Sequence, residues 1–133
     1  MKPKISIVTL GVKDVEASRS FYEKMGFPTK TEANSKHVMF ETEGVVFALF
    51  PKDELADDAK IEPSSLSGTS AITFAHNEPS KEDVDRVYQE LLNIGAKQIK
   101  KPEDVFWGGY SGYIADPDGY LWEIAWNPFD DLT

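Results

Sequence analysis

The sequence predicts an α+β fold built from two copies of a strand, helix, strand, strand, strand module. Three observations predict it: an apolar β-branched run followed by an amphipathic helical pattern occurs twice, a glycine ends each helical pattern, and each half closes with a strand pair folded about a turn. The 133 residues are 41% hydrophobic, which suits one domain with a core. We expect a first module at 1–51, a linker at 52–67 and a second module at 68–133.

The first module begins with a strand and a helix. Residues 4–12, KISIVTLGV, are β-branched and apolar, as in a strand. Asp14 can cap the helix that follows, and the apolar residues of 14–25 recur at helical spacing. Gly26 suits the left-handed position that ends a helix.

The rest of the first half is predicted to be extended. Residues 27–33 are predicted to form one strand, and 37–50 a hairpin folded about Glu43 and Gly44. Residues 51–68 are acidic, contain proline and serine, and show no apolar periodicity. We expect a linker or long loop there.

The same order of elements starts again at residue 70. Residues 70–77 are predicted to form a strand, and Ser80 can cap a helix that ends near Gly95. Its apolar stripe consists of Val84, Val87, Tyr88, Leu91 and Ile94.

The second half ends in a short strand and a hairpin. The short strand is predicted at 98–101, and a glycine- and aromatic-rich connection follows it. The hairpin pairs 113–115 with 120–126 about a turn of sequence DPDG. When the two halves are aligned on Gly44 and Gly119, Phe47 matches Trp122.

Composition excludes several classes of partner. The formal net charge is −9, from 14 Lys and Arg against 23 Asp and Glu, which disfavours nucleic acid and anionic membranes. The chain contains no cysteine, so thiolate chemistry is absent and a cytoplasmic location is expected. No segment is long and apolar enough to span a bilayer.

Glu123 stands out among the residues of the last predicted strand. It lies between Trp122 and Ile124, where a buried, unpaired carboxylate would be costly. The residue therefore lies on a wet face, is paired, or is a ligand.

The duplicated order of elements, together with VKDVEASRSFYEKMGF near the N-terminus and YIADPDGYLWEI near the C-terminus, resembles the vicinal oxygen chelate superfamily. This superfamily includes glyoxalase I, extradiol dioxygenases, fosfomycin-resistance enzymes and bleomycin-resistance proteins. The resemblance implies a glyoxalase-like fold, in which the modules form a curved mixed sheet around a cavity. It also implies a divalent metal held from the first and last strands of each module, and a homodimer.

At most of the positions where this family holds its metal ion, the chain has residues that do not normally coordinate a metal. Glu123 matches the last-strand ligand of the second module, but the matching positions of the first module are Ile7 and Ala48. The fourth position is Thr73 or His76, depending on the alignment. Strand alternation favours Thr73, because its bulky neighbours should face the helix.

Catalytic divalent sites usually take about three ligands from His, carboxylate or Cys. We therefore expect no cofactor. If a metal were bound, Glu123 and His76 would be its ligands.

The cavity is expected to hold a small organic molecule instead. Alternation places Ser111 and Tyr113 on the strand face opposite Ile114, and the matching positions contact substrate in the fosfomycin-resistance branch that the chain resembles. Aromatic walls suit planar or cationic ligands. The candidate binding residues are Ser111, Tyr113, Trp107, Tyr110, Trp126, Phe40 and Thr73.

The sequence therefore predicts a glyoxalase- or bleomycin-resistance-like protein with a degenerate metal site that binds an aromatic or cationic molecule. It would act by sequestration, or by metal-free acid-base chemistry with Glu123 and Tyr113 as catalytic residues and Glu123 as the proton carrier. One alternative is a divalent-metal-dependent lyase, isomerase or dioxygenase that uses Glu123 and His76. Another is an interaction module whose cavity is filled by its own side chains.

Overall fold

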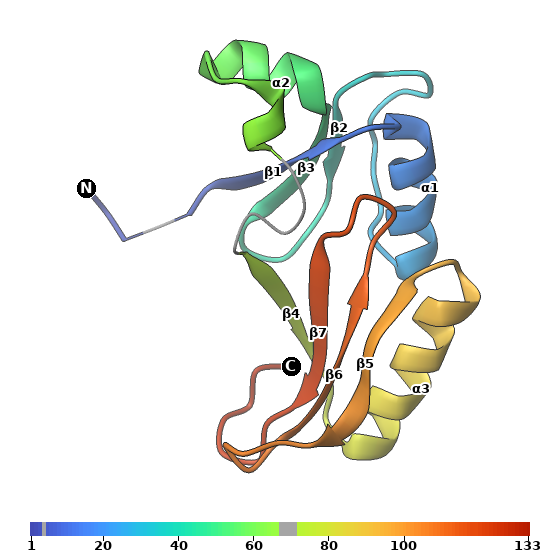
Figure 1. Ribbon diagram of the computed structural model, residues 1–133. Coiled ribbons are helices and arrows are strands. Elements are labelled where there is room, and N and C mark those ends of the chain that lie inside the picture. The colour runs from blue at the N-terminus through green and yellow to red at the C-terminus, as the bar shows by residue number, and fades with distance from the viewer. Residues whose placement is uncertain (4, 67–71) are drawn as a thin grey trace. The chain divides into compact units, whose positions relative to one another are not determined.

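The computed structural model describes residues 1–3, 5–66 and 72–133. The chain divides into two compact units, Met1–Ser67 and Gly68–Thr133, and Figure 1 traces the elements of each. Residues 4, 70 and 71 of the predicted strands lie outside the described residues. No helix in the described ranges is long and apolar enough to cross a membrane.

The first unit carries a three-stranded mixed sheet. Its strand order is β1-β3-β2, with β1 parallel to β3 and β2 antiparallel to β3. The elements are β1 (Ile7–Val12), α1 (Val15–Met25), β2 (Val38–Phe40), β3 (Val46–Pro51) and α2 (Lys52–Ala59), followed by a 3₁₀ turn at Pro63–Ser65.

The predicted limits of α1 are confirmed by its caps. The Asp14 carboxylate accepts a hydrogen bond of 3.0 Å from the backbone N–H of Ala17, and Gly26 ends the helix at φ 115°. Tyr22 of α1 is fully buried, with its ring 5.8 Å from Phe40 and 4.9 Å from Phe47. This aromatic cluster joins the helix to the β2–β3 hairpin.

The predicted strand at 27–33 is wrong except for one isolated bridge, between Thr29 and Phe40. Hydrogen bonds to threonine hydroxyls replace the backbone hydrogen bonds of regular strand pairing there. The Thr29 hydroxyl donates to the Met39 carbonyl at 2.6 Å, and the Met39 N–H donates to the Thr31 hydroxyl at 3.0 Å. Such side-chain bonds compete with regular strand pairing.

The prediction of an irregular loop over 51–68 is also wrong, because α2 lies within it. Asp53 and Glu54 occupy the first turn of α2, where the helix dipole favours negative charge. The side chain of Ala56 is completely buried, and α2 packs on β1 and β3. The small apolar face of α2 is therefore enough to dock the helix on the first sheet.

The second unit repeats the plan with a full set of strands. Its sheet has the order β4-β7-β6-β5, with β4 parallel to β7 and the other pairs antiparallel. The elements are β4 (Thr73–Asn77), α3 (Lys81–Asn93), β5 (Lys97–Asp104), β6 (Tyr110–Ala115) and β7 (Leu121–Trp126). Strands β5 and β6 are both longer than predicted.

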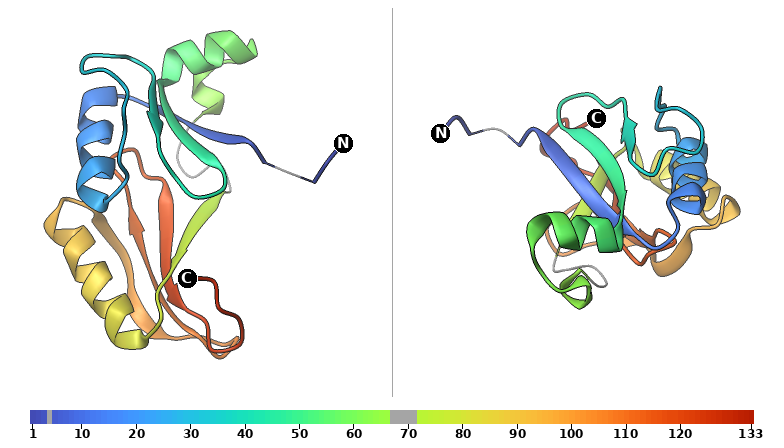
Figure 2. Two further views of the ribbon diagram at one scale, coloured as in Figure 1. Left: turned by 180° about the vertical axis from the view of Figure 1, so that it is seen from behind. Right: turned by 90° about the horizontal axis from the view of Figure 1, so that it is seen from above.

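Helix α3 covers one face of this sheet, as Figures 1 and 2 show. The Ser80 hydroxyl caps the helix by accepting from the N–H of Asp83 at 3.1 Å, as predicted. Val84, Tyr88 and Leu91 are buried on the inner side of α3. Ile114 and Ile124 of the sheet are fully buried beneath α3.

The α+β class is confirmed, and the described part of the chain repeats the module with one difference, since the first sheet has three strands and the second has four. In each unit the first strand lies parallel to the last, and the last forms an antiparallel hairpin with the strand before it. The cavity expected between the modules stays a prediction.

Asp116 holds the last hairpin closed. Its carboxylate accepts hydrogen bonds from the N–H groups of Asp118 at 2.9 Å and Tyr120 at 2.8 Å, and the side chain is buried. The turn therefore depends on a side chain as well as on the backbone.

We predict that Asp116→Ala lowers the free energy of unfolding by about 1–3 kcal/mol, because two N–H groups lose a charged acceptor. Urea denaturation followed by circular dichroism measures this loss. The control Asp58→Ala, at an exposed position of α2, should change stability by less than about 0.5 kcal/mol. Equal stability of both variants would contradict this role of Asp116.

Candidate functional site

Strand pairing places Glu123 beside Tyr113. Glu123 of β7 is the register partner of Tyr113 on β6 and of Ala75 on β4. Paired residues on neighbouring strands point to the same face of a sheet, and residues two apart on one strand share that face. Ser111 and Thr73 therefore lie on the same face, away from α3, as the alternation predicted.

Glu123 and Tyr113 interact electrostatically. Burial, followed by the negative charge of Glu123, raises the pKa of the Tyr113 hydroxyl. Both side chains are half-buried, whereas Ser111 is 1% exposed. Both side chains therefore keep partial access to solvent, which explains how the strand tolerates a carboxylate.

Lys100 is a charged residue of this face that sequence analysis missed. On β5, Gln98 pairs with Ile114, but the next pair is Lys100 with Tyr113, so Ile99 is an extra residue in the strand. This β-bulge turns Lys100 toward Tyr113, and its positive charge opposes the rise in the pKa of Tyr113. Lys100 also pairs with Glu103 at 3.2 Å.

The sequence carries a faint signal of this bulge. A Cβ added to Gly112 would lie 2.7 Å from the nitrogen of Pro102 and 2.8 Å from the carbonyl oxygen of Lys100. Only glycine fits such a close approach, and proline in a strand is confined to edges and bulges. The combination of Pro102 in one strand and Gly112 in its neighbour is therefore the sequence signal that indicates the bulge.

The structure does not bring Tyr110 and Trp126 to Glu123. They pair with each other on the face that packs against α3, where the ammonium of Lys81 lies 5.6 Å from both ring centroids. The Tyr110 hydroxyl donates to Asp85 at 2.7 Å, and this bond raises its pKa to about 12.

Trp107 belongs to the β5–β6 turn, and its ring covers Gly109. It therefore lies near the Trp126 end of the sheet, because a Cβ on Gly109 would also approach the Trp126 carbonyl. A binding role for Trp107, Tyr110 or Trp126 stays a prediction, but Tyr110 and Trp126 do not share the face of Glu123.

Phe40 is a core residue of the first unit. It is 2% exposed and pairs with Phe47, just as Ile114 pairs with Trp122 in the second unit. The turn after Phe40 is one residue shorter than the turn after Ile114, so the gap-free alignment with Ala115 is out of register by one. A slip of one residue exchanges the faces of a strand, which explains why Phe40 packs on α1.

His76 is not a partner of Glu123 in the second unit. It pairs with Ile124, on the opposite face of the sheet from Glu123, and its imidazole Nε2 lies 2.7 Å from Glu78. Thr73 shares the face of Glu123, as predicted, but a threonine hydroxyl is a weak ligand for the divalent ions of this family.

The donor set therefore does not fit the divalent metal that the fold family implies. The pairing of the first strand with the last in each unit makes Ile7 equivalent to Thr73 and Ala48 equivalent to Glu123. Of these four side chains, Ile7 and Ala48 cannot coordinate a metal ion and Thr73 is a weak ligand. The described residues contain no group of three or more His, Asp or Glu that could hold a metal ion. No chemistry can be assigned to a metal here.

The duplicated module, the DPDG turn and a carboxylate on the last strand together define a glyoxalase-like protein. The family model of the Glyoxalase/Bleomycin resistance protein/Dioxygenase superfamily matches residues 4–124. The chain belongs to this superfamily.

Two relatives illustrate the range of similarity in sequence. The protein YraH of Bacillus subtilis is 29% identical over 124 residues, which cover 91% of this chain and 96% of YraH. An uncharacterized protein of Mycobacterium bovis is 32% identical over 72 residues, 54% of this chain and 45% of that protein. The match thus spans less than half the length of the mycobacterial relative.

Solved structures support the same assignment. A glyoxalase-related enzyme from Fulvimarina pelagi is 31% identical with a TM-score of 0.85, over 95% of this chain and 89% of that one. A lactoylglutathione lyase from Agrobacterium tumefaciens is 20% identical with a TM-score of 0.74, over the full length of both chains. The second similarity shows the fold alone.

We predict that Glu123→Gln lowers the pKa of Tyr113 toward its ordinary value, because a negative neighbour is removed. Lys100→Met should raise the pKa of Tyr113 further, because its positive charge favours the phenolate. NMR titration of the ¹³Cζ resonance of labelled tyrosine measures both shifts.

The control for this titration is Lys24→Met, at an exposed position of α1, which should leave the pKa of Tyr113 unchanged. Shifts of the same sign in Glu123→Gln and Lys100→Met would refute the arrangement.

Proposed function

We propose that this superfamily member binds a small organic molecule on the Glu123 face of the second sheet without a resident metal ion. The observation that carries the proposal is that the strand register sets Glu123 beside Tyr113, at a position where the family's metal-ligand set is not matched by suitable donors. A half-buried carboxylate beside a phenol ring suits a ligand that presents a cationic or N–H donor group next to a flat apolar part.

The neighbouring side chains support this ligand class. The Tyr113 ring offers a flat contact surface, and Ser111 adds a hydroxyl on the same face. Lys100 is the register partner of Tyr113 on the next strand and offers a positive charge on the same side of the sheet. A ligand with an acceptor group on its far side would therefore meet complementary charge at both ends.

Binding alone accounts for a sequestration role. If the protein also catalyses a reaction, we expect Tyr113 to donate a proton to the ligand and Glu123 to accept one from it. The homodimer and the cytoplasmic location belong to the proposal as well; they rest on the family resemblance and on the lack of cysteine.

We expect a thermal-shift screen of planar cations and amines to give a ligand that stabilises the wild-type protein. At a ligand concentration of about 100 times Kd the gain is about 2.7 kcal/mol, which raises Tm by roughly 10 °C for a chain of this size. Glu123→Gln and Tyr113→Phe should each weaken binding of that ligand roughly tenfold, because a charge-assisted contact or its orientation is lost.

The matched control is Glu43→Gln, which makes the same change of charge in the exposed β2–β3 turn and should leave the affinity unchanged. The same protein should carry no stoichiometric divalent metal by plasma mass spectrometry, and chelators should not alter binding. A tightly held stoichiometric metal, or a ligand indifferent to Glu123→Gln, would contradict the proposal.

A further inference from the structure

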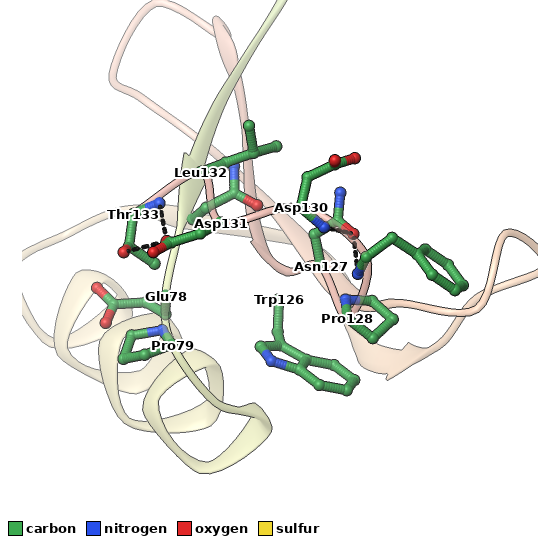
Figure 3. A pocket seen from close by; sticks show the side chains of 11 residues that line it. Glu78, Pro79, Trp126, Asn127, Pro128, Asp130, Asp131, Leu132 and Thr133 are labelled. Atoms are coloured by element: carbon green, nitrogen blue, oxygen red, sulfur yellow. Dashed lines mark hydrogen bonds between the residues drawn. The ribbon is translucent and has the colours of Figure 1, made fainter.

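A pocket lies in the second unit, at the end of the sheet where Trp126 is found. Figure 3 shows this pocket of about 320 Å³, formed between the end of β4 and the segment that follows β7. Glu78 and Pro79 form one side, Trp126 and Pro128 form another, and the segment 130–133 closes it above. Neither Glu123 nor Tyr113 lines it.

Local structure builds the walls of this pocket. The N–H of Glu78 donates to the carbonyl of Ala125 at 2.8 Å, so the chain leaves β4 beside the end of β7. The side-chain oxygen of Asn127 accepts from the N–H groups of Phe129 at 2.8 Å and Asp130 at 3.2 Å, which turns the chain back toward β4. Hydrogen bonds therefore fix the path of the chain on two sides of the pocket.

The charge of the lining has one sign. Its charged residues are Glu78, Asp130 and Asp131, all of which are acidic. The Glu78 side chain is only 16% exposed, so its charge is less screened by solvent than that of a free surface carboxylate.

Glu78 keeps capacity for a further donor. Its Oε1 contacts His76 at 2.7 Å, whereas Oε2 is 3.9 Å from Arg86, which makes shorter contacts with Asp83 and Glu90. A carboxylate offers about four lone-pair sites. Neither His76 nor Arg86 lines the pocket, so both approach the carboxylate from outside it.

Apolar surfaces complete the pocket. In Figure 3 the indole of Trp126 faces the side formed by Glu78 and Pro79, and Pro128 lies next to the ring. The aromatic pair of Trp126 and Tyr110 already attracts one cation, the ammonium of Lys81. Indole is the best side chain for contact with organic cations.

We propose that this pocket is a binding site for a small organic ammonium compound, with the carboxylate of Glu78 receiving the cation and Trp126 contacting the apolar part. The volume of about 320 Å³ is at the lower end of the range for small-molecule sites. The site is independent of the one proposed on the Glu123 face and does not require it.

The test uses benzylamine as the probe, with benzyl alcohol as its neutral match and benzoate as its anionic match. Binding is followed by ¹H–¹⁵N NMR of the three tryptophan indole N–H signals, with the Trp126 signal assigned by its loss in Trp126→Phe. Benzylamine should shift the Trp126 signal with a Kd of about 1 mM or lower, and the two matched compounds should bind at least roughly tenfold more weakly.

Variants then separate the residues that bind from the rest. Glu78→Gln should weaken benzylamine binding roughly tenfold, because a charged acceptor becomes neutral. Asp131→Asn, a milder change in the closing segment, should weaken it by a smaller factor. Glu82→Gln removes one charge from an exposed position of α3 outside the lining and should have no effect.

Three results would overturn this proposal: no shift of the Trp126 signal, equal binding of benzyl alcohol, or a loss of affinity in Glu82→Gln that equals the loss in Glu78→Gln. The NMR spectrum of each variant reports whether it is folded. If Glu78→Gln does not fold, Asp131→Asn still tests the proposal. Glu123→Gln should leave benzylamine binding at this pocket unchanged, so failure of one site does not imply failure of the other.

Discussion

The pairing of β7 with β4 on one side and β6 on the other is the constraint on which the candidate site depends. This register sets Glu123 beside Tyr113 and Ala75, and turns His76 to the face that packs on α3. Because strand side chains alternate, no rotation of His76 alone could bring its imidazole next to Glu123 within this sheet. The backbone hydrogen bonds of the sheet therefore determine which side chains share the face of Glu123.

The parts of the fold that local sequence determines could be predicted. The limits of α1 and α3 follow from Asp14, Ser80 and Gly26, whose side chains or backbone freedom act within one turn of chain. The DPDG hairpin is equally local, and it sets the alternation that places Tyr113 and Ser111 opposite Ile114. The family resemblance then supplied the significance of Glu123.

The parts that depend on contacts distant in sequence could not be predicted. Phe40 was misplaced because the two hairpin turns differ by one residue, which local patterns do not reveal. Lys100 was missed because the bulge that turns it toward Tyr113 requires the backbone of β5 to approach Gly112. Helix α2 was missed because its apolar face is small and gains stability only by docking on β1 and β3.

The central proposal is that Glu123 interacts with the hydroxyl of Tyr113 across the β6–β7 pair and is not reserved for a metal ion. A double-mutant cycle of unfolding free energies with Tyr113→Phe, Glu123→Gln and the double variant measures this interaction most directly. Hydrogen bonds to charged groups contribute about 1.5–3 kcal/mol, and for this half-exposed pair we predict a coupling of about 1 kcal/mol. A coupling below about 0.3 kcal/mol, within the usual additivity of independent sites, would contradict the account.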